Sequence, residues 1–207
     1  MQTIQLNQYS VDIHDNAGIM LSGGADSAVL FYILMKYSKT PIKVYTLASA
    51  EKFRANIDVT KRLIDYCMRE FDVKQLVHHI QYEPAQTEQV LFRDAVKDVT
   101  EQKIKVLYTA ITKCPPREVT DGFKEKNTVA EERDPSKQHP EYIFARKIYR
   151  PFYNLDKADI KNLYDELGIL DTVFPLSRSC ESLEIDTGHC GKCWWCEERQ
   201  WAFGRLE

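Results

Sequence analysis

The chain has 207 residues, of which 43% are hydrophobic and 29% are charged, and its formal net charge is −3. This composition is typical of a globular protein with a sizeable core, and the negative charge argues against general nucleic-acid binding. The length favours one domain over residues 1–207. No apolar run is long enough to span a membrane, and the polar N-terminus is unlike a signal peptide, so we expect a cytoplasmic protein.

The first segment, residues 1–16, is polar except at four spaced positions that predict an edge hairpin: Ile4, Leu6, Val11 and Ile13. The apolar run 19–21 predicts the first core strand, and the apolar pattern over residues 27–37 predicts the first helix. Between this strand and this helix the chain reads SGGADS, residues 22–27.

A strand that turns through glycines into a helix is suited to binding an anion, because loop N–H groups converge there and the helix dipole adds positive charge. Gly23 and Gly24 let the backbone approach a phosphate closely. Ser22 and Ser27 offer hydroxyls, and Asp26 can cap the helix or hold a magnesium ion. The alternative is an ordinary strand-to-helix turn with a Ser/Asp cap.

The following residues alternate between apolar runs, which predict strands, and amphipathic stretches, which predict helices. The predicted strands cover residues 42–47, 74–80 and 105–110, and the predicted helices cover residues 57–71 and 86–99. This alternation predicts an α/β fold with a doubly wound parallel sheet.

Ligands of such sheets bind beyond the carboxyl ends of the strands. The second predicted strand ends in three candidates for contact with adenine, each with a plain core strand as the alternative: Thr46, Leu47 and Ala48. Thr109 falls near the carboxyl end of the fourth predicted strand, so it is a candidate for substrate binding.

Residues 111–150 lose this pattern, because prolines and many charges interrupt it. The segment is either a surface excursion or a substrate loop, since it leaves a strand where a nucleotide should lie. Its cations are candidates to bind phosphates or a carboxylate: Lys113, Arg117, Arg146, Lys147 and Arg150. Asp156 is then a predicted N-cap for a helix over residues 158–167, which Lys157 opens and Gly168 ends.

Four of the six cysteines lie near the C-terminus, and three of them form the string CGKCWWC: Cys180, Cys190, Cys193 and Cys196. Four thiolates suit tetrahedral zinc, so residues 177–207 predict a zinc knuckle whose metal is structural. A disulfide pair, disfavoured in a reducing compartment, and an iron–sulfur cluster are the alternatives. The surrounding aromatic residues are expected to pack the C-terminal helix, with a homodimer contact as a second interpretation: Trp194, Trp195, Trp201 and Phe203.

These motifs carry a family resemblance. SGGxDS is the signature of the PP-loop ATP pyrophosphatases, and residues 18–27 resemble it at every fixed position. With CxxCxxC added, residues 19–37 and 151–203 are similar to the 7-cyano-7-deazaguanine synthases of the queuosine pathway. The chain departs from them after the first motif, where Ala28 and Val29 follow, and over residues 112–123, where a Tyr-Pro-Asp-Cys-like string is usual. A diverged phage or mobile-element paralogue would fit these departures.

The resemblance implies cleavage of ATP between its α- and β-phosphates, with Mg²⁺ and Zn²⁺ as further cofactors. It implies a ligase that converts a deazapurine carboxylate and ammonia through an amide to a nitrile, releasing AMP and pyrophosphate. Ser22, Asp26 and Lys157 are the expected catalytic residues, and the phosphates are expected at Ser22, Gly23, Gly24, Asp26 and Ser27. The expected substrate residues are Thr109, Lys113, Arg117 and Arg150.

Two other functions compete with this one. PP-loop enzymes also activate carbonyls for sulfur transfer, so a thiolase acting on tRNA or a small molecule is one alternative. It would need a free catalytic cysteine, for which Cys114 is the best candidate. A non-catalytic, zinc-containing nucleotide-binding module is the other alternative, although the intact SGGADS string argues against it.

Overall fold

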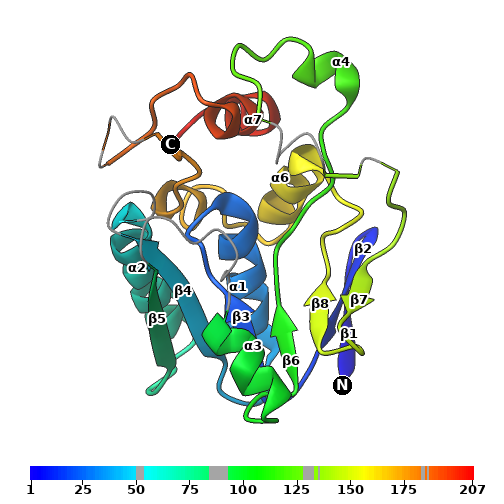
Figure 1. The fold of residues 1–207 in the computed structure, drawn as a ribbon, viewed down its shortest axis with the longest axis vertical. Coiled ribbons are helices and arrows are strands. Elements are labelled where there is room, and N and C mark those ends of the chain that lie inside the picture. The colour runs from blue at the N-terminus through cyan, green and yellow to red at the C-terminus, as the bar shows by residue number, and fades with distance from the viewer. Residues whose placement is uncertain (50–53, 84–92, 128–132, 135, 183–184, 186) are drawn as a thin grey trace.

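The computed structural model describes residues 1–49, 54–83, 93–127, 133–134, 136–182, 185 and 187–207. Within this part of the chain, a six-stranded sheet runs in the order β5-β4-β3-β6-β8-β7 (Figure 1). The strands are β3 (Ala17–Met20), β4 (Lys43–Ser49), β5 (Val77–Glu83), β6 (Val106–Tyr108), β7 (Glu141–Ile143) and β8 (Ile148–Arg150).

The pairings from β5 through β8 are all parallel, as the sequence predicts, and β7 adds an antiparallel edge strand against β8. The predicted parallel sheet is therefore confirmed, and the antiparallel edge strand is an addition that the sequence does not predict. Both β7 and β8 lie in residues 111–150, where no strand is predicted. Each is three residues long, which is too short to show a periodicity of two among the surrounding charges.

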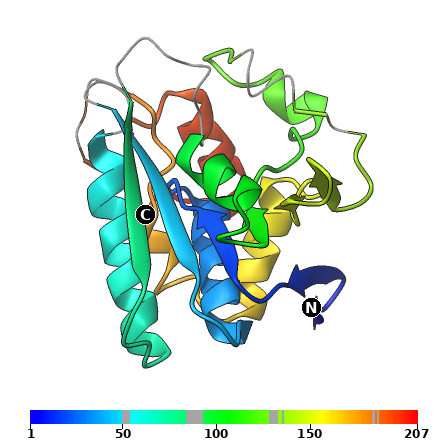
Figure 2. The same cartoon turned by 60° about the horizontal axis from the view of Figure 1, so that its bottom comes forward.

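Helices cover both faces of the sheet, so the doubly wound arrangement is confirmed (Figure 2). The described helices are α1 (Ala25–Tyr37), α2 (Arg54–Glu70), α3 (Arg93–Thr100), α4 (Arg117–Thr120), α6 (Lys157–Glu166) and α7 (Trp194–Phe203). Alternating strand residues reach opposite faces: Ile19 joins the core beneath α1, α2 and α6, whereas Met20 joins the cluster beneath α3. Residues 86–92 of the predicted third helix lie outside the described residues.

The N-terminal hairpin forms as predicted, from β1 (Gln2–Leu6) and β2 (Tyr9–Ile13). It is a separate two-stranded sheet and not an edge of the main one. Its apolar face still joins the main core through Leu6, Val11 and Ile13. The Tyr108 hydroxyl of β6 also donates a hydrogen bond of 2.7 Å to the Asp12 carbonyl oxygen, which fastens the hairpin to the sheet.

The start of α6 is fixed by a capping box. The Asp156 carboxylate accepts from the N–H groups of Ala158 and Asp159, and the Asp159 side chain accepts from the Asp156 N–H. Gly168 ends the helix region with φ +67°. The predicted cap and stop are both confirmed, and they place Lys157 on the first helical residue. No helix in the described part of the chain is both long and apolar enough to span a bilayer.

Candidate active site and metal centre

The strand order reverses between β3 and β6, because β4 and β5 follow on one side of β3 and β6 lies on the other. Open α/β sheets bind ligands at this point, beyond the carboxyl ends of the strands. A cavity of about 240 Å³ occupies this position. It brings together six of the residues predicted for the site: Ser22, Gly24, Asp26, Ser27, Leu47 and Thr109.

The phosphate loop, residues 22–27, is held in shape by its own hydroxyls. Gly24 is the N-cap residue of α1, with no side-chain cap, so Asp26 does not cap the helix. Ser22 Oγ lies 3.0 Å from Ser27 Oγ, and Ser27 Oγ donates to the Gly24 carbonyl oxygen over 3.1 Å. Two hydroxyls therefore lie at the N-terminus of a 13-residue helix, where the helix dipole favours an anion.

The two glycines of this loop have different surroundings, so a side chain would have different effects at the two positions. Gly23 has φ +86°, and a Cβ added to it would lie 2.7 Å from Val59 Cγ1 on α2. Its missing side chain thus allows close packing against α2, a role that the sequence does not suggest. A Cβ on Gly24 would meet only Ser22 Oγ, at 3.5 Å.

Asp26 and Lys157 form an ion pair that joins α1 to α6. Lys157 Nζ lies 2.7 Å from Asp26 Oδ1 and 2.5 Å from Oδ2. The Lys157 side chain is 4% exposed and that of Asp26 is 19% exposed. Glu198 of α7, which is fully buried, places Oε2 3.6 Å from the same ammonium. The sequence singles out both members of the pair but gives no sign of Glu198.

A second cavity, of about 200 Å³, adjoins the first and shares Ser22, Gly24, Asp26 and Asn56 with it. Its other walls come from α6 and from the segment around the cysteines: Lys157, Arg178, Ser179, Cys180, Glu181 and Trp195. Sequence reasoning assigns no binding role to Asn56, Arg178, Glu181 or Trp195. The only feature of the sequence that could have pointed to Trp195 is its position between Cys193 and Cys196, where it is expected to pack the C-terminal helix.

The other predicted binding residues lie outside both cavities. The Thr46 hydroxyl is buried and donates to the Leu21 carbonyl oxygen over 3.1 Å, so it links β4 to the strand beside it. Ala48 is buried within β4. Because side chains alternate along a strand, only Leu47 of the predicted trio faces the cavity.

The predicted cations of residues 111–150 do not converge on the site either. Arg117 is exposed on α4, 3.9 Å from Asp121, and Arg150 donates to Glu141 over 2.9 Å. Lys113 is not among the lining residues of the two cavities. Arg133 instead reaches inward, donating to Glu198 Oε1 over 2.6 Å. Arg133 therefore connects residues 111–150 to α7, a contact that the sequence does not predict.

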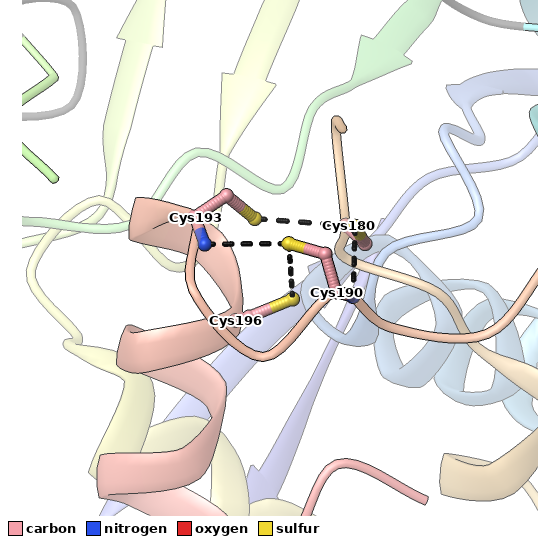
Figure 3. A group of neighbouring side chains, drawn as sticks. All are labelled: Cys180, Cys190, Cys193 and Cys196. Atoms are coloured by element: carbon pink, nitrogen blue, oxygen red, sulfur yellow. Dashed lines mark hydrogen bonds between the residues drawn. The ribbon is translucent and has the colours of Figure 1, made fainter. Parts of the chain in front are cut away.

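The four C-terminal cysteines gather as predicted (Figure 3). Their sulfurs all lie within 4.8 Å of one another, with Cys190 and Cys196 3.9 Å apart and Cys193 and Cys180 4.0 Å apart. Tetrahedral zinc with bonds of about 2.3 Å requires sulfurs about 3.8 Å apart, so this geometry fits a metal ion. The separations exclude a disulfide, whose sulfurs are about 2.05 Å apart.

Hydrogen bonds prepare this cluster for a cation. The Cys193 N–H points at Cys190 Sγ over 3.3 Å, and the Cys190 N–H points at Cys180 Sγ over 3.4 Å. A hydrogen bond with the Cys196 side chain lowers the pKa of Cys193 to about 4. This lowering favours the thiolate form of Cys193, which is the form that binds metal.

Arg178 connects the metal centre to the phosphate loop. Its guanidinium donates to the carbonyl oxygens of Cys180, Ile185 and Gly188 over 2.7 to 3.1 Å. Its backbone N–H donates to the Gly23 carbonyl oxygen over 2.8 Å. One residue thus fixes both the loop that carries the cysteines and the loop at the start of α1.

The remaining two cysteines are buried. Cys67 lies on α2, and burial raises its pKa to about 12. Cys114 packs against Phe123 and Trp194 and is not among the residues that line the two cavities. Neither thiol therefore has the exposure that is usual for a reactive cysteine.

Two family models match the chain: "Asparagine synthase" over residues 13–114 and "Queuosine biosynthesis protein QueC" over residues 140–207. Both models describe families of the PP-loop superfamily, whose members use ATP, so the chain is similar to this superfamily over residues 13–114 and 140–207. Within it, the C-terminal third is similar to QueC. A curated 7-cyano-7-deazaguanine synthase of Methanococcus vannielii is 44% identical over 62 residues, which are 28% of this chain and 26% of that protein.

Solved structures with a similar backbone fold have low sequence identity to this chain. NMN synthetase from Francisella tularensis has a TM-score of 0.49 and 15% identity, covering 93% of this chain and 79% of its own. PAPS reductase from Candida auris, in a phosphate complex, has a TM-score of 0.43 and is 13% identical, and the match covers 75% of this chain and 74% of the reductase. The U34-tRNA thiolase NcsA from Methanococcus maripaludis, with its [4Fe-4S] cluster, has a TM-score of 0.39 and is 15% identical. The match covers 76% of this chain and 57% of the thiolase. No conclusion about this chain's reaction follows from similarity at this level.

The different roles of the two loop glycines can be measured. We predict that Gly23→Ala lowers the free energy of unfolding by about 2 kcal/mol, because φ is positive and the new methyl meets Val59. Gly24→Ala is the matched control and should cost about 0.5 kcal/mol. Urea unfolding followed by circular dichroism checks both values. Equal losses in the two variants would contradict the packing role of Gly23.

Proposed function

We propose that the chain is an ATP-dependent ligase of the 7-cyano-7-deazaguanine synthase type, which forms carbon–nitrogen bonds and releases AMP and pyrophosphate. The observation that carries the proposal is the convergence of the phosphate loop, the Asp26–Lys157 pair and the QueC-matched cysteine segment on two adjoining cavities. The chain covers only 26% of its curated relative, so the reaction itself is inferred.

ATP would occupy the cavity between β3 and β6. Its phosphates would lie at Ser22, Gly24 and Ser27, where hydroxyls and the start of α1 favour an anion. The adenine would lie against Leu47. Asp26 would hold Mg²⁺ beside the phosphates, because its carboxylate keeps lone pairs beyond those bonded to Lys157.

Two successive adenylylations account for the product. The carboxylate oxygen of the deazapurine attacks the α-phosphorus, the α–β phosphoanhydride bond breaks, and pyrophosphate leaves. Ammonia then displaces AMP from the acyl carbon to give the amide. A second ATP adenylylates the amide oxygen and releases a second pyrophosphate, and loss of AMP and of the two amide protons leaves the nitrile.

The protein contributes positioning and charge to these steps. Negative charge grows on the leaving pyrophosphate, so donors fixed beforehand lower the barrier most. The buried Lys157 ammonium is held at this point by Asp26. Two reactants fixed in adjoining cavities also gain from proximity, so the scheme needs no protein nucleophile.

The cysteine cluster would hold zinc as a structural ion. All four ligands come from the chain, which leaves no open position for a water molecule. Ammonia is the proposed nitrogen source, and the aromatic residues around the cysteines are the proposed contact of a homodimer.

The first test follows AMP and the organic product together. We predict that wild-type protein forms AMP from ATP, ammonia and a 7-deazapurine carboxylate, with the amide or nitrile detected by mass spectrometry. Asp26→Asn should lower AMP formation by about 100-fold or more, since the carboxylate at the phosphates is lost. Asp165→Asn, which removes an exposed carboxylate on α6, is the matched control and should leave the rate unchanged. Wild-type turnover by Asp26→Asn at saturating ATP would remove the phosphate-site assignment.

Cys114 separates this reaction from sulfur transfer. We predict that Cys114→Ser keeps its activity within a few-fold, because no step of amide or nitrile formation needs a thiolate. The thiol packs against Phe123 and Trp194, so the loss should be seen in stability, measured by thermal unfolding. Loss of all product, with ATP binding and metal content intact, would instead favour the thiolase.

The metal can be identified directly. We predict about one zinc ion per chain by elemental analysis, and loss of that zinc in Cys193→Ser. Cys67→Ala is the matched control, since Cys67 is buried on α2 away from the cluster, and it should retain zinc. Iron together with acid-labile sulfide in the wild type would point to an iron–sulfur cluster.

A further inference from the structure

The second cavity lies between the loop at residues 22–27 and the cysteine cluster. It shares four residues with the nucleotide cavity, including Asp26. A ligand bound in it would therefore lie beside the phosphates. An acceptor that attacks the α-phosphorus must lie within about 3–3.5 Å of that atom, and this adjoining space is suited to place it there.

Trp195 gives this cavity an aromatic wall. It follows Cys193 by two residues and precedes Cys196 by one, so the metal centre and α7 fix its backbone. In the described structure its indole Nε1 is buried and has no hydrogen-bond partner. Buried donors are normally paired, so an acceptor atom on a ligand would complete this one.

The indole Nε1 of the neighbouring Trp194 is also buried without a hydrogen-bond partner, so what separates the two rings is their place relative to the cavity. Trp194 is fully buried, packs edge-to-face on Phe123 with ring centroids 4.8 Å apart, and is not among the cavity residues. Trp201, further along α7, is half-buried and also absent from the lining of both cavities. Among these three rings only Trp195 lines the cavity, and the Arg133 guanidinium lies over its ring, 5.3 Å from the centroid.

The charged groups of the cavity indicate what kind of ring it takes. Glu181 lines the cavity next to Cys180, and its carboxylate can accept two parallel N–H bonds from the edge of an aminopyrimidine ring. Lys157 lines it too and can attract a carboxylate. The guanidinium of Arg178 already donates to three carbonyl oxygens, so it shapes the wall and does not select the ligand.

We propose that this cavity is the acceptor subsite, and that Trp195 and Glu181 set acceptor specificity. Trp195 stacks on a planar heteroaromatic ring, and Glu181 accepts hydrogen bonds from the ring N–H groups. The proposal rests on the proposed function and deepens it, because it names the ring edge and the stacking face that the acceptor must present.

Calorimetric titration of 7-carboxy-7-deazaguanine, with a non-hydrolysable ATP analogue bound, tests the subsite without turnover. Trp195→Leu should raise the Kd of the acceptor by about tenfold or more, because base stacking on an aromatic residue is lost. Trp195→Phe should restore most of the affinity. Trp201→Leu is the matched control and should change the Kd by less than twofold, and all variants should bind the ATP analogue and zinc as the wild type does.

Glu181 is tested by discrimination between ligands. Wild-type protein should bind 7-carboxy-7-deazaguanine about tenfold more tightly than an analogue methylated on the ring N–H groups, because methylation removes the donors. Glu181→Gln should reduce this preference to less than threefold, since an amide offers one acceptor where the carboxylate offers two.

Each result separates the subsite from the reaction. An unchanged acceptor Kd in Trp195→Leu, or an equal change in Trp201→Leu, overturns the subsite and leaves the proposed ATP chemistry in place. Selective loss of binding in Trp195→Leu, with no AMP formed by the wild type from the bound acceptor, retains the subsite and overturns the proposed function. Absence of acceptor binding in the wild type overturns both.

Discussion

The ion pair between Asp26 and Lys157 joins the N-terminal and C-terminal halves of the chain at the site itself. Asp26 comes from the first turn of α1 and Lys157 from the first turn of α6. Removal of one partner from a buried pair costs about 3–5 kcal/mol, because the other charge is left uncompensated. Packing of α6 against α1 and the charge of the wall shared by the two cavities thus depend on the same two side chains. Glu198 and Arg133 extend this network to α7 and to residues 111–150.

The cysteine cluster has a wider role than holding the C-terminus. Cys180 and its neighbours Ser179 and Glu181 form one wall of the second cavity, and Trp195 comes from inside the CxxC step. Arg199 of α7, which is fully buried, donates to Ser177 Oγ over 2.9 Å and to the Phe174 carbonyl oxygen over 3.1 Å. The metal-binding segment is therefore continuous with the core, and its shape sets the shape of the cavity.

Local patterns predict much of this structure, because short sequence stretches determine them. SGGADS, the Asp156 cap and the CxxC steps each specify a turn or a helix end through a few adjacent residues. The hydrophobic periodicity likewise predicts the strands from β3 to β6. It fails for β7 and β8, which are stable only through pairing with β6 and with each other. Local patterns also fail for Glu198, Arg133 and Trp195, because their partners lie far along the chain. The Lys and Arg residues predicted to bind the substrate fail for the same reason.

The contact between Arg178 and Gly23 has a thermodynamic consequence. The residue that orders the cysteine loop also restrains the carbonyl oxygen at the bend of the phosphate loop. Ordering of either loop therefore lowers the entropic cost of ordering the other. A metal held by the cysteines and a nucleotide held at the start of α1 would therefore be linked ligands, and by reciprocity each would strengthen the binding of the other by the same factor. The cysteine centre would then act as a heterotropic effector of ATP affinity from outside the reacting atoms.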